Sequence, residues 1–180
     1  LFDPREGPIE LAPHVEVRAG TRLAGPIYAG EHSKLLGGSI SAFSGGPYCY
    51  MRGEIEHVTV MGYSNKVHQG FLGHSVVGTW VNLGAMTTNS DLKNNYGKIR
   101  VQIESEIIET DKQFLGTMIG DYSRTGISTM LNTGTIIGLG ANVFGEGFQD
   151  KFIPSFQWGR ESKTELDKFL ITAERMKKRR

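Results

Sequence analysis

The sequence predicts an all-β protein: a parallel β-helix of hexapeptide repeats with an extruded loop and a C-terminal α-helix. The main observation is a period of six, in which one aliphatic and one small or β-branched position recur in each unit. A polar stretch without this period, residues 88–98, interrupts the repeat, and a helical pattern is confined to residues 162–180. Three six-residue sides close one triangular coil, and successive coils stack.

Residues 1–8 contain two prolines and indicate an extended entry segment. The repeat follows in two runs, and its aliphatic positions are Leu11, Val17, Leu23, Ala29 and Leu35, then Ile119, Thr125, Leu131, Ile137 and Val143. Small partners four residues after an aliphatic position include Thr21, Ser33, Ser123 and Thr135. The aliphatic side chain fills the coil and the small residue lets the chain turn a corner, so Leu11 and Leu131 are expected to point inward.

Between the two runs the period is less regular. Residues 40–50 lose the register, and Gly45-Gly46-Pro47 indicates a loop or a bulged corner. Alternation over residues 51–60 predicts a strand. Its expected inward residues are Ile55, Val58 and Val60. Coils resume over residues 61–87 with spacings of five as well as six. The interior residues expected there are Met61, Val67, Leu72, Val77 and Leu83.

Residues 88–98 have few apolar side chains and are expected to form a loop pushed out of a corner. Alternation over residues 99–107 predicts a strand that extends a sheet beside the coils. Residues 150–159 are interpreted as a surface connection. The helix predicted from Ser162 begins with a capping box that includes Glu165. Its apolar face is formed by Leu166, Phe169, Leu170, Ala173 and Met176. This helix, residues 162–180, is expected to cover unpaired strand edges at the open end or side of the coils.

Composition excludes several classes of protein. The chain has 180 residues with a net charge of +1, which predicts one domain and gives no preference for nucleic acid or anionic membranes. The single Cys49 cannot form an intrachain disulfide, which favours a reducing compartment. There is no long apolar run and no signal-peptide pattern, so we expect a cytoplasmic protein. The first residue is Leu1 rather than Met, which predicts that an N-terminal part of a longer protein is missing.

Two blocks of sequence resemble a known family. They are SNKVHQGFLGHSVVGTWVNLGAMTTNSDLKNNYGK, residues 64–98, and GISTMLNTGTIIGLGANVFGEGF, residues 126–148, followed by FIPSFQWG. Both resemble the C-terminal acyltransferase half of bacterial sugar-phosphate nucleotidyltransferases, similar to the bifunctional N-acetylglucosamine-1-phosphate uridylyltransferase/glucosamine-1-phosphate N-acetyltransferase. The resemblance covers residues 8–159. It implies a left-handed β-helix, a rare exception to right-handed crossovers.

The resemblance also implies an organisation and a co-substrate. It implies a β-helix acyltransferase-like domain at residues 1–159, a C-terminal helix at 160–180 and an N-terminal nucleotidyltransferase domain that this chain lacks. Acetyl-CoA is the implied acyl donor. A homotrimer is implied as well, with active sites between neighbouring subunits.

Carried over by position, the general base of the family falls on His68, in the spacing His-x-x-aromatic-Leu-Gly. A carboxylate near this base falls on Glu54. The NxGA segment places a substrate-binding Asn at Asn82 and a backbone group facing the thioester at Ala85. The remaining implied positions are Asn89 or Asp91 for the substrate-binding residue of the extruded loop and Gly145 for a cofactor-lining residue. The phosphate-binding Arg of the family has no matching position, and Arg52 and Lys66 are the candidates for this role.

Acetyl transfer needs a base, donors for an oxyanion and a groove for the pantetheine arm. A neutral histidine suits the first role, and Glu54 would fix the tautomer of His68. Backbone N–H groups at Gly84-Ala85 are candidate oxyanion donors. His74 is the rival base, because other acyltransferases of this architecture place the base in a similar Gly-His context. His57 is interpreted as structural, and His14 and His32 as solvated corner residues. The five histidines lack Cys or Asp at ligand spacing, so no metal site is expected.

The sequence therefore predicts transfer of acetyl from acetyl-CoA to the amine of a hexosamine 1-phosphate, with glucosamine 1-phosphate as the first candidate. This activity would belong to nucleotide-sugar and cell-envelope precursor synthesis. One alternative is a non-catalytic β-helix that trimerises or regulates a nucleotidyltransferase domain. A second alternative is an acyltransferase that uses another amino sugar or another acyl group.

Overall fold

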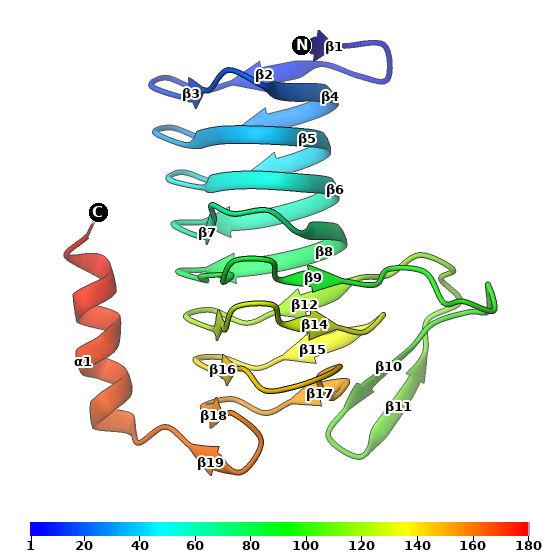
Figure 1. Ribbon diagram of the computed structural model, residues 1–180, viewed down its shortest axis with the longest axis vertical. Helices are drawn as coiled ribbons and strands as arrows, with labels where there is room; N and C mark the ends of the chain where they lie inside the picture. Colours follow the sequence, from blue (N-terminus) through cyan, green and yellow to red (C-terminus); the bar gives the residue numbers. More distant parts are fainter. Residues whose placement is uncertain (180) are drawn as a thin grey trace.

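Stacked coils of short parallel strands make up the body of the molecule in the computed structural model, which describes residues 1–179 (Figure 1). The strands of the first coils are β1 (Phe2–Asp3), β2 (Ile9–Leu11), β3 (Glu16–Val17), β4 (Thr21–Ala29), β5 (Lys34–Gly45), β6 (Tyr50–Gly62), β7 (Asn65–Lys66) and β8 (Phe71–Thr79). Later strands are β9 (Thr88–Asn89), β12 (Thr117–Ile119), β13 (Arg124–Thr125), β14 (Met130–Leu131), β15 (Thr135–Ile137), β16 (Asn142–Val143), β17 (Phe152–Ile153), β18 (Gln157–Trp158) and β19 (Ser162–Lys163). The fold is the expected left-handed parallel β-helix.

Successive coils are held together by parallel strand pairing along each side. The order β1-β4-β5-β6-β8-β12-β15-β17 follows one side down the stack. Thr117 lies beside Thr135, so a coil takes 18 residues there, as three six-residue sides require. Glu54 lies beside Phe71, so the coil above β8 is one residue shorter.

The predicted interior is largely confirmed. Leu23, Leu35 and Leu131 are fully buried, and so are Ile55 and Val58 of the alternating strand. Leu11, however, is 39% exposed, because its coil is nearly the first of the stack and few residues cover it.

Two residues of the shortened coils were assigned to the wrong face. Val60 is buried, so the strand alternation turns the next residue, Met61, outward, and it is 55% exposed. Val67 is only half-buried, because Lys66 takes the interior position instead.

Two predicted connections belong to the coils. Residues 40–50 are mostly strand, since β5 runs to Gly45 and pairs with both β4 and β6. The glycines there let the backbones of neighbouring coils approach closely, because a Cβ on Gly46 would lie 2.2 Å from the carbonyl oxygen of Met61. Residues 150–159 form a further coil, because β17 pairs with β15 and β18 pairs with β16.

The extruded segment leaves the stack after Ser90 and returns at Leu115, so a loop at a corner is confirmed. An isolated bridge between Leu92 and Phe114 closes its base. The single predicted strand is wrong: residues 100–109 form an antiparallel hairpin of β10 (Arg100–Ile103) and β11 (Glu106–Glu109). Its partners are within the hairpin rather than in the coils, although β10 lies against β15 (Figure 1).

One corner of the prism carries a column of stacked rings. Its members are His14, His32, Tyr48, Tyr63, Trp80 and Tyr122, all at positive φ, with centroid separations of 4.6–6.2 Å. Gly140 interrupts this column, and the Phe169 ring from the C-terminal helix fills the gap. A Cβ on Gly140 would lie 2.8 Å from that ring. Phe169 meets Tyr122 and Phe156 edge-on at 5.7 and 5.1 Å, a favourable aromatic arrangement that attaches the helix.

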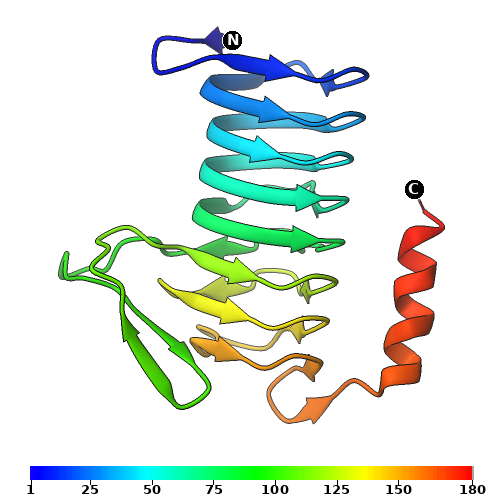
Figure 2. The ribbon, with the colours of Figure 1, turned by 180° about the vertical axis from the view of Figure 1, so that it is seen from behind.

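The helix α1 (Leu166–Lys177) begins later than predicted, and the capping box is wrong. Ser162 belongs to β19, which pairs antiparallel with β18, and Glu165 is an N-cap without a side-chain hydrogen bond. α1 runs along the side of the stack, opposite the β10–β11 hairpin (Figures 1 and 2). Only part of the predicted apolar face is used, because Phe169 is buried whereas Leu166 and Leu170 are exposed. The last residue of the predicted helix, Arg180, lies outside the described residues.

Within residues 1–179, no helix has the length and apolar character needed to cross a membrane.

Replacement of Phe169 by Ala is expected to release α1 from the stack. Truncating a buried phenylalanine costs about 3 kcal/mol, so the detached form should become roughly a hundredfold more populated. Limited trypsin digestion reports this population, since α1 contains Lys168 and Arg175. Leu170→Ala is the matched control, because this side chain is half-exposed on the same helix. Equal digestion rates for the two variants would contradict the anchoring role of Phe169.

Candidate functional site

A histidine–carboxylate pair lies where the extruded segment leaves the coils. Nδ1 of His74 is 2.7 Å from Oδ2 of Asp91, and both side chains are mostly buried. His74 lies in β8 at a corner of the prism, and Asp91 is the first residue of the extruded segment one coil below. An ionised carboxylate only accepts hydrogen bonds, so this contact places the proton of neutral His74 on Nδ1 and leaves Nε2 as the basic nitrogen.

Rings on both faces fix the plane of the His74 imidazole. His57 stacks on one face at 4.6 Å, and Phe114 stacks at 5.1 Å. The side chain of His74 keeps 25% of its surface exposed, so part of the ring remains accessible. Ala42, His57 and His74 lie beside one another in successive coils and form a corner column of their own. All three have positive φ, so this is the shared conformation of the corner rather than strain confined to one residue.

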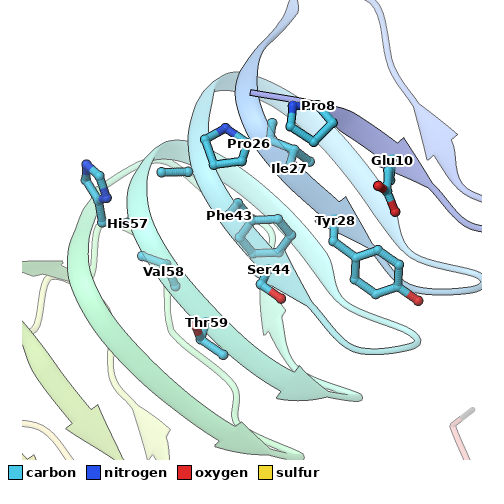
Figure 3. Close-up of a pocket in the computed structure, with 11 residues that line it drawn as sticks. Pro8, Glu10, Pro26, Ile27, Tyr28, Phe43, Ser44, His57, Val58 and Thr59 are labelled. Carbon is cyan, nitrogen blue, oxygen red and sulfur yellow. The ribbon is translucent and has the colours of Figure 1, made fainter. Parts of the chain in front are cut away.

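An open groove of about 500 Å³ has His57, the stacking neighbour of His74, in its lining (Figure 3). It forms because Ala42 is small, so the corner column is recessed between Pro26 and His57. Pro8, Pro26 and Phe43 give the groove apolar walls, and the His57 ring lies at one end (Figure 3). The groove ends one coil before His74. His57 lines the groove and also stacks on His74, so it lies between them.

The pair predicted from the resemblance, His68 and Glu54, is not joined in the structure. Both side chains are exposed, and no hydrogen bond or ion pair links them among residues 1–179. His68 lies at a second corner, where its carbonyl oxygen accepts a hydrogen bond from Nζ of Lys66. The catalytic roles of His68 and Glu54 therefore stay predictions, whereas the rival base His74 contacts a carboxylate, that of Asp91.

Two predicted substrate-binding side chains point into the prism. Lys66 is 1% exposed, and its ammonium donates to the carbonyl oxygens of His68 at 3.0 Å and Arg52 at 3.4 Å. Burial lowers its pKa to about 8. Asn89 is buried too: its Oδ1 accepts from the Gly73 N–H, and its Nδ2 donates to the Gly73 carbonyl. These internal bonds do not support substrate contacts by either side chain.

The other predicted residues lie on different sides of the prism. Asn82 lines a cavity of about 400 Å³ on the flank beside α1. Ala85 lies near the second corner, where its carbonyl accepts a hydrogen bond from the N–H of Ser128. The neighbouring Gly84 N–H is occupied, since it donates to Thr125 Oγ1 at 2.9 Å. Gly145 is exposed and lines a surface hollow of about 330 Å³.

Sequence reasoning named Asp91 and His74 without joining them. The spacing held a usable signal, because the step of 17 positions from His57 to His74 equals one coil, and the same step from His74 reaches Asp91. Phe114 carried no such signal, since it returns to this corner only after the whole extruded segment.

Fold and site together define a left-handed hexapeptide β-helix with a histidine–carboxylate pair at the base of an extruded loop. No protein-family model matches the chain. A bifunctional sugar-1-phosphate nucleotidylyltransferase/acetyltransferase of Sulfurisphaera tokodaii is 30% identical over 91 residues, covering 51% of this chain and 23% of that protein. The bifunctional protein GlmU of Methanococcus aeolicus is 30% identical over 93 residues, covering 49% of this chain and 22% of that protein. GlmU of Methanocaldococcus jannaschii is 27% identical over 85 residues.

These relatives confirm the resemblance seen in the sequence blocks. The matched part of the chain spans less than a quarter of the length of each relative. Among solved structures, a mutant of AntD, an N-acyltransferase from Bacillus cereus, in complex with dTDP and coenzyme A, matches with a TM-score of 0.52. It is 13% identical, and the match covers 95% of this chain and 91% of that chain. At this identity the likeness establishes the fold.

Lys66→Met is expected to alter the pH dependence of stability. The pKa of Lys66 is about 8 in the folded chain against an ordinary 10.5, so the unfolded state binds more protons here between these values. The free energy of unfolding should therefore rise with pH across that interval, by up to about 1.4 kcal/mol per pH unit from this residue. Below the interval the ammonium is charged in both states and its contribution is constant.

Urea unfolding of the wild type and Lys66→Met across this interval measures the difference in slope. Lys112→Met is the control, because Lys112 is exposed on the extruded segment and its loss should leave the slope unchanged. Identical slopes for the wild type and Lys66→Met would show that Lys66 is not a buried ammonium.

Proposed function

We propose that this protein transfers an acetyl group from acetyl-CoA to the amine of a hexosamine 1-phosphate, with glucosamine 1-phosphate as the first candidate. The observation that carries the proposal is the His74–Asp91 pair at 2.7 Å, held at the base of the extruded segment. The name of the Sulfurisphaera tokodaii relative, a sugar-1-phosphate nucleotidylyltransferase/acetyltransferase, supports a sugar phosphate as acceptor and acetyl as the transferred group. The coenzyme A in the AntD complex is consistent with acetyl-CoA as donor.

In the proposed reaction His74 acts as the general base. Its Nε2 takes a proton from the sugar amine as the amine nitrogen attacks the thioester carbonyl and the N–C bond forms. Asp91 stabilises the imidazolium through the Nδ1–H hydrogen bond. When the tetrahedral intermediate collapses, the C–S bond breaks, and the imidazolium returns the proton to the coenzyme A thiolate. Atoms and charge balance without any further reactant.

Two features favour His74 over His68 in this role. Asp91 sets the tautomer of His74, and the rings of His57 and Phe114 hold its plane, so little reorientation is needed for proton transfer. His68 has no carboxylate or ring partner among the described residues. The groove in Figure 3 leads toward this column and offers apolar walls for an elongated ligand.

The proposal includes a homotrimer with sites between subunits. Ala85 and Gly145, the residues expected to face the donor, do not lie at the corner of His74 and Asp91. A donor bound near them would reach His74 only if that residue came from a neighbouring subunit. The resemblance implies the same arrangement. We also place the reaction in the cytoplasm, in nucleotide-sugar synthesis for the cell envelope.

His74→Ala should lower kcat for thiol release from acetyl-CoA with glucosamine 1-phosphate by about 10²- to 10⁴-fold, the usual contribution of a general base. Asp91→Asn should cause a smaller fall, because the imidazole remains but loses its charged partner. His68→Ala is the matched control and should retain nearly full activity.

Loss of activity in His68→Ala with activity retained in His74→Ala would move the base to His68. An intact trimer that releases no thiol with any amino sugar would instead favour the assembly role of a non-catalytic β-helix.

A further inference from the structure

Three buried polar atoms beneath the start of α1 have no hydrogen-bond partner within residues 1–179. They are Nε of Arg124, Nδ2 of Asn142 and Oγ1 of Thr164. An unsatisfied buried polar group is destabilising, so native structures rarely leave one without a reason. Arg124 and Asn142 are direct neighbours in register between β13 and β16. Arg124 and Thr164 line one cavity. The three atoms therefore belong to one region of the surface.

Arg124 carries a positive charge in this region without a matching negative one. No carboxylate among the described residues forms an ion pair with it. Burial lowers the pKa of its guanidinium, and no neighbouring acid offsets that effect. Glu165 lines the same cavity, but its carboxylate is 3.2 Å from Nζ of Lys168. Lys163 adds a further positive charge to the lining.

The cavity has room for a ligand. It occupies about 390 Å³ between the flank of the coils and the start of α1, and Trp158 forms part of its wall. Arg124 also lines the cavity of about 400 Å³ that contains Asn82 and, from the far end of α1, Met176. Small-molecule sites commonly begin near 300 Å³. The guanidinium thus lies where two ligand-sized spaces under α1 meet.

We propose that this pocket, lined by Arg124, Thr164 and Lys168, with Asn142 beside Arg124 in register, binds the phosphoryl group of an anionic ligand. A guanidinium donates two parallel hydrogen bonds to phosphate oxygens. The Asn142 amide and the Thr164 hydroxyl supply the further donors that the structure leaves unsatisfied, and Lys163 and Lys168 supply charge. Coenzyme A and hexosamine 1-phosphate share this chemistry. Naming them as sources rests on the proposed function, whereas the pocket itself does not.

The pocket lies on the α1 side of the prism, and the His74–Asp91 pair lies on the side of the extruded segment (Figures 1 and 2). A ligand anchored at Arg124 therefore lies on a different side of the prism from His74 of the same chain. In the proposed trimer, it would serve a neighbouring subunit.

Isothermal titration calorimetry with inorganic phosphate, coenzyme A and glucosamine 1-phosphate, each alone, tests the proposal on the whole chain. At least one phosphorylated probe should bind the wild type, and Arg124→Leu should weaken that binding by at least about tenfold, as expected for loss of a charge-assisted bidentate contact. Arg175→Leu is the matched control, because it removes the same charge from an exposed position on α1. Its affinity should stay within about twofold of the wild type.

Thr164→Val keeps the size of the side chain and removes only the hydroxyl, so it tests the site even if Arg124→Leu fails to fold. It should weaken the same probe several-fold. The ligand whose affinity depends on Arg124 identifies the source of the phosphate. If no probe binds, or if Arg124→Leu and Thr164→Val bind like the wild type, the proposal is overturned. Because binding is measured without turnover, a catalytically inactive protein that binds phosphate would contradict only the proposed function.

Discussion

Parallel hydrogen bonding between successive coils is the constraint on which the rest of this structure depends. It sets each residue beside its counterpart one coil away, as Glu54 lies beside Phe71 and Thr117 beside Thr135. Residues at a corner therefore form columns along the prism. The column from His14 to Tyr122 shows that rings placed at one corner of successive coils stack on one another. The same geometry stacks His57 on His74.

The extruded segment adds a histidine–carboxylate pair to such a column. Where the column would receive its next member below His74, the chain instead leaves the stack at Asp91. Its carboxylate meets Nδ1 of the imidazole at 2.7 Å. The returning strand then supplies Phe114, whose ring takes the stacking position. A purely structural column thus gains a polar partner at its edge while it keeps an aromatic one on its face.

The interior of the coils follows from the sequence because the period of six is a local property. Leu131 and Ile137 needed only their spacing to be placed correctly. Met61 and Val67 were misplaced because a shortened side shifts the register by one residue, and a period of six cannot show where that happens. Lys66 was therefore predicted to bind the substrate phosphate, although its buried ammonium donates hydrogen bonds to two carbonyl groups.

Features that depend on two segments far apart in the sequence were harder to predict from it. The helix α1 was predicted from its own pattern, but its place on the prism depends on a missing side chain at Gly140, which the Phe169 ring replaces. The capping box failed for a related reason, because the backbone of Ser162 is used by the β18–β19 pairing. The sequence around Arg124 does not show that its Nε lacks a partner. Whether a partner is present depends on which distant segments fold against this residue.

The His74 corner and the Arg124 flank lie on different sides of the prism (Figures 1 and 2). A filled interior separates the three sides, so a single chain cannot bring the His74 corner to the Arg124 flank. Within one coil, however, the corners and the flanks lie at nearly the same height along the prism axis. Threefold association about an axis parallel to the prism would set a corner of one subunit against a flank of the next. In the proposed trimer, one chain would then offer the proposed base to its neighbour on one side and the proposed phosphate pocket on the other.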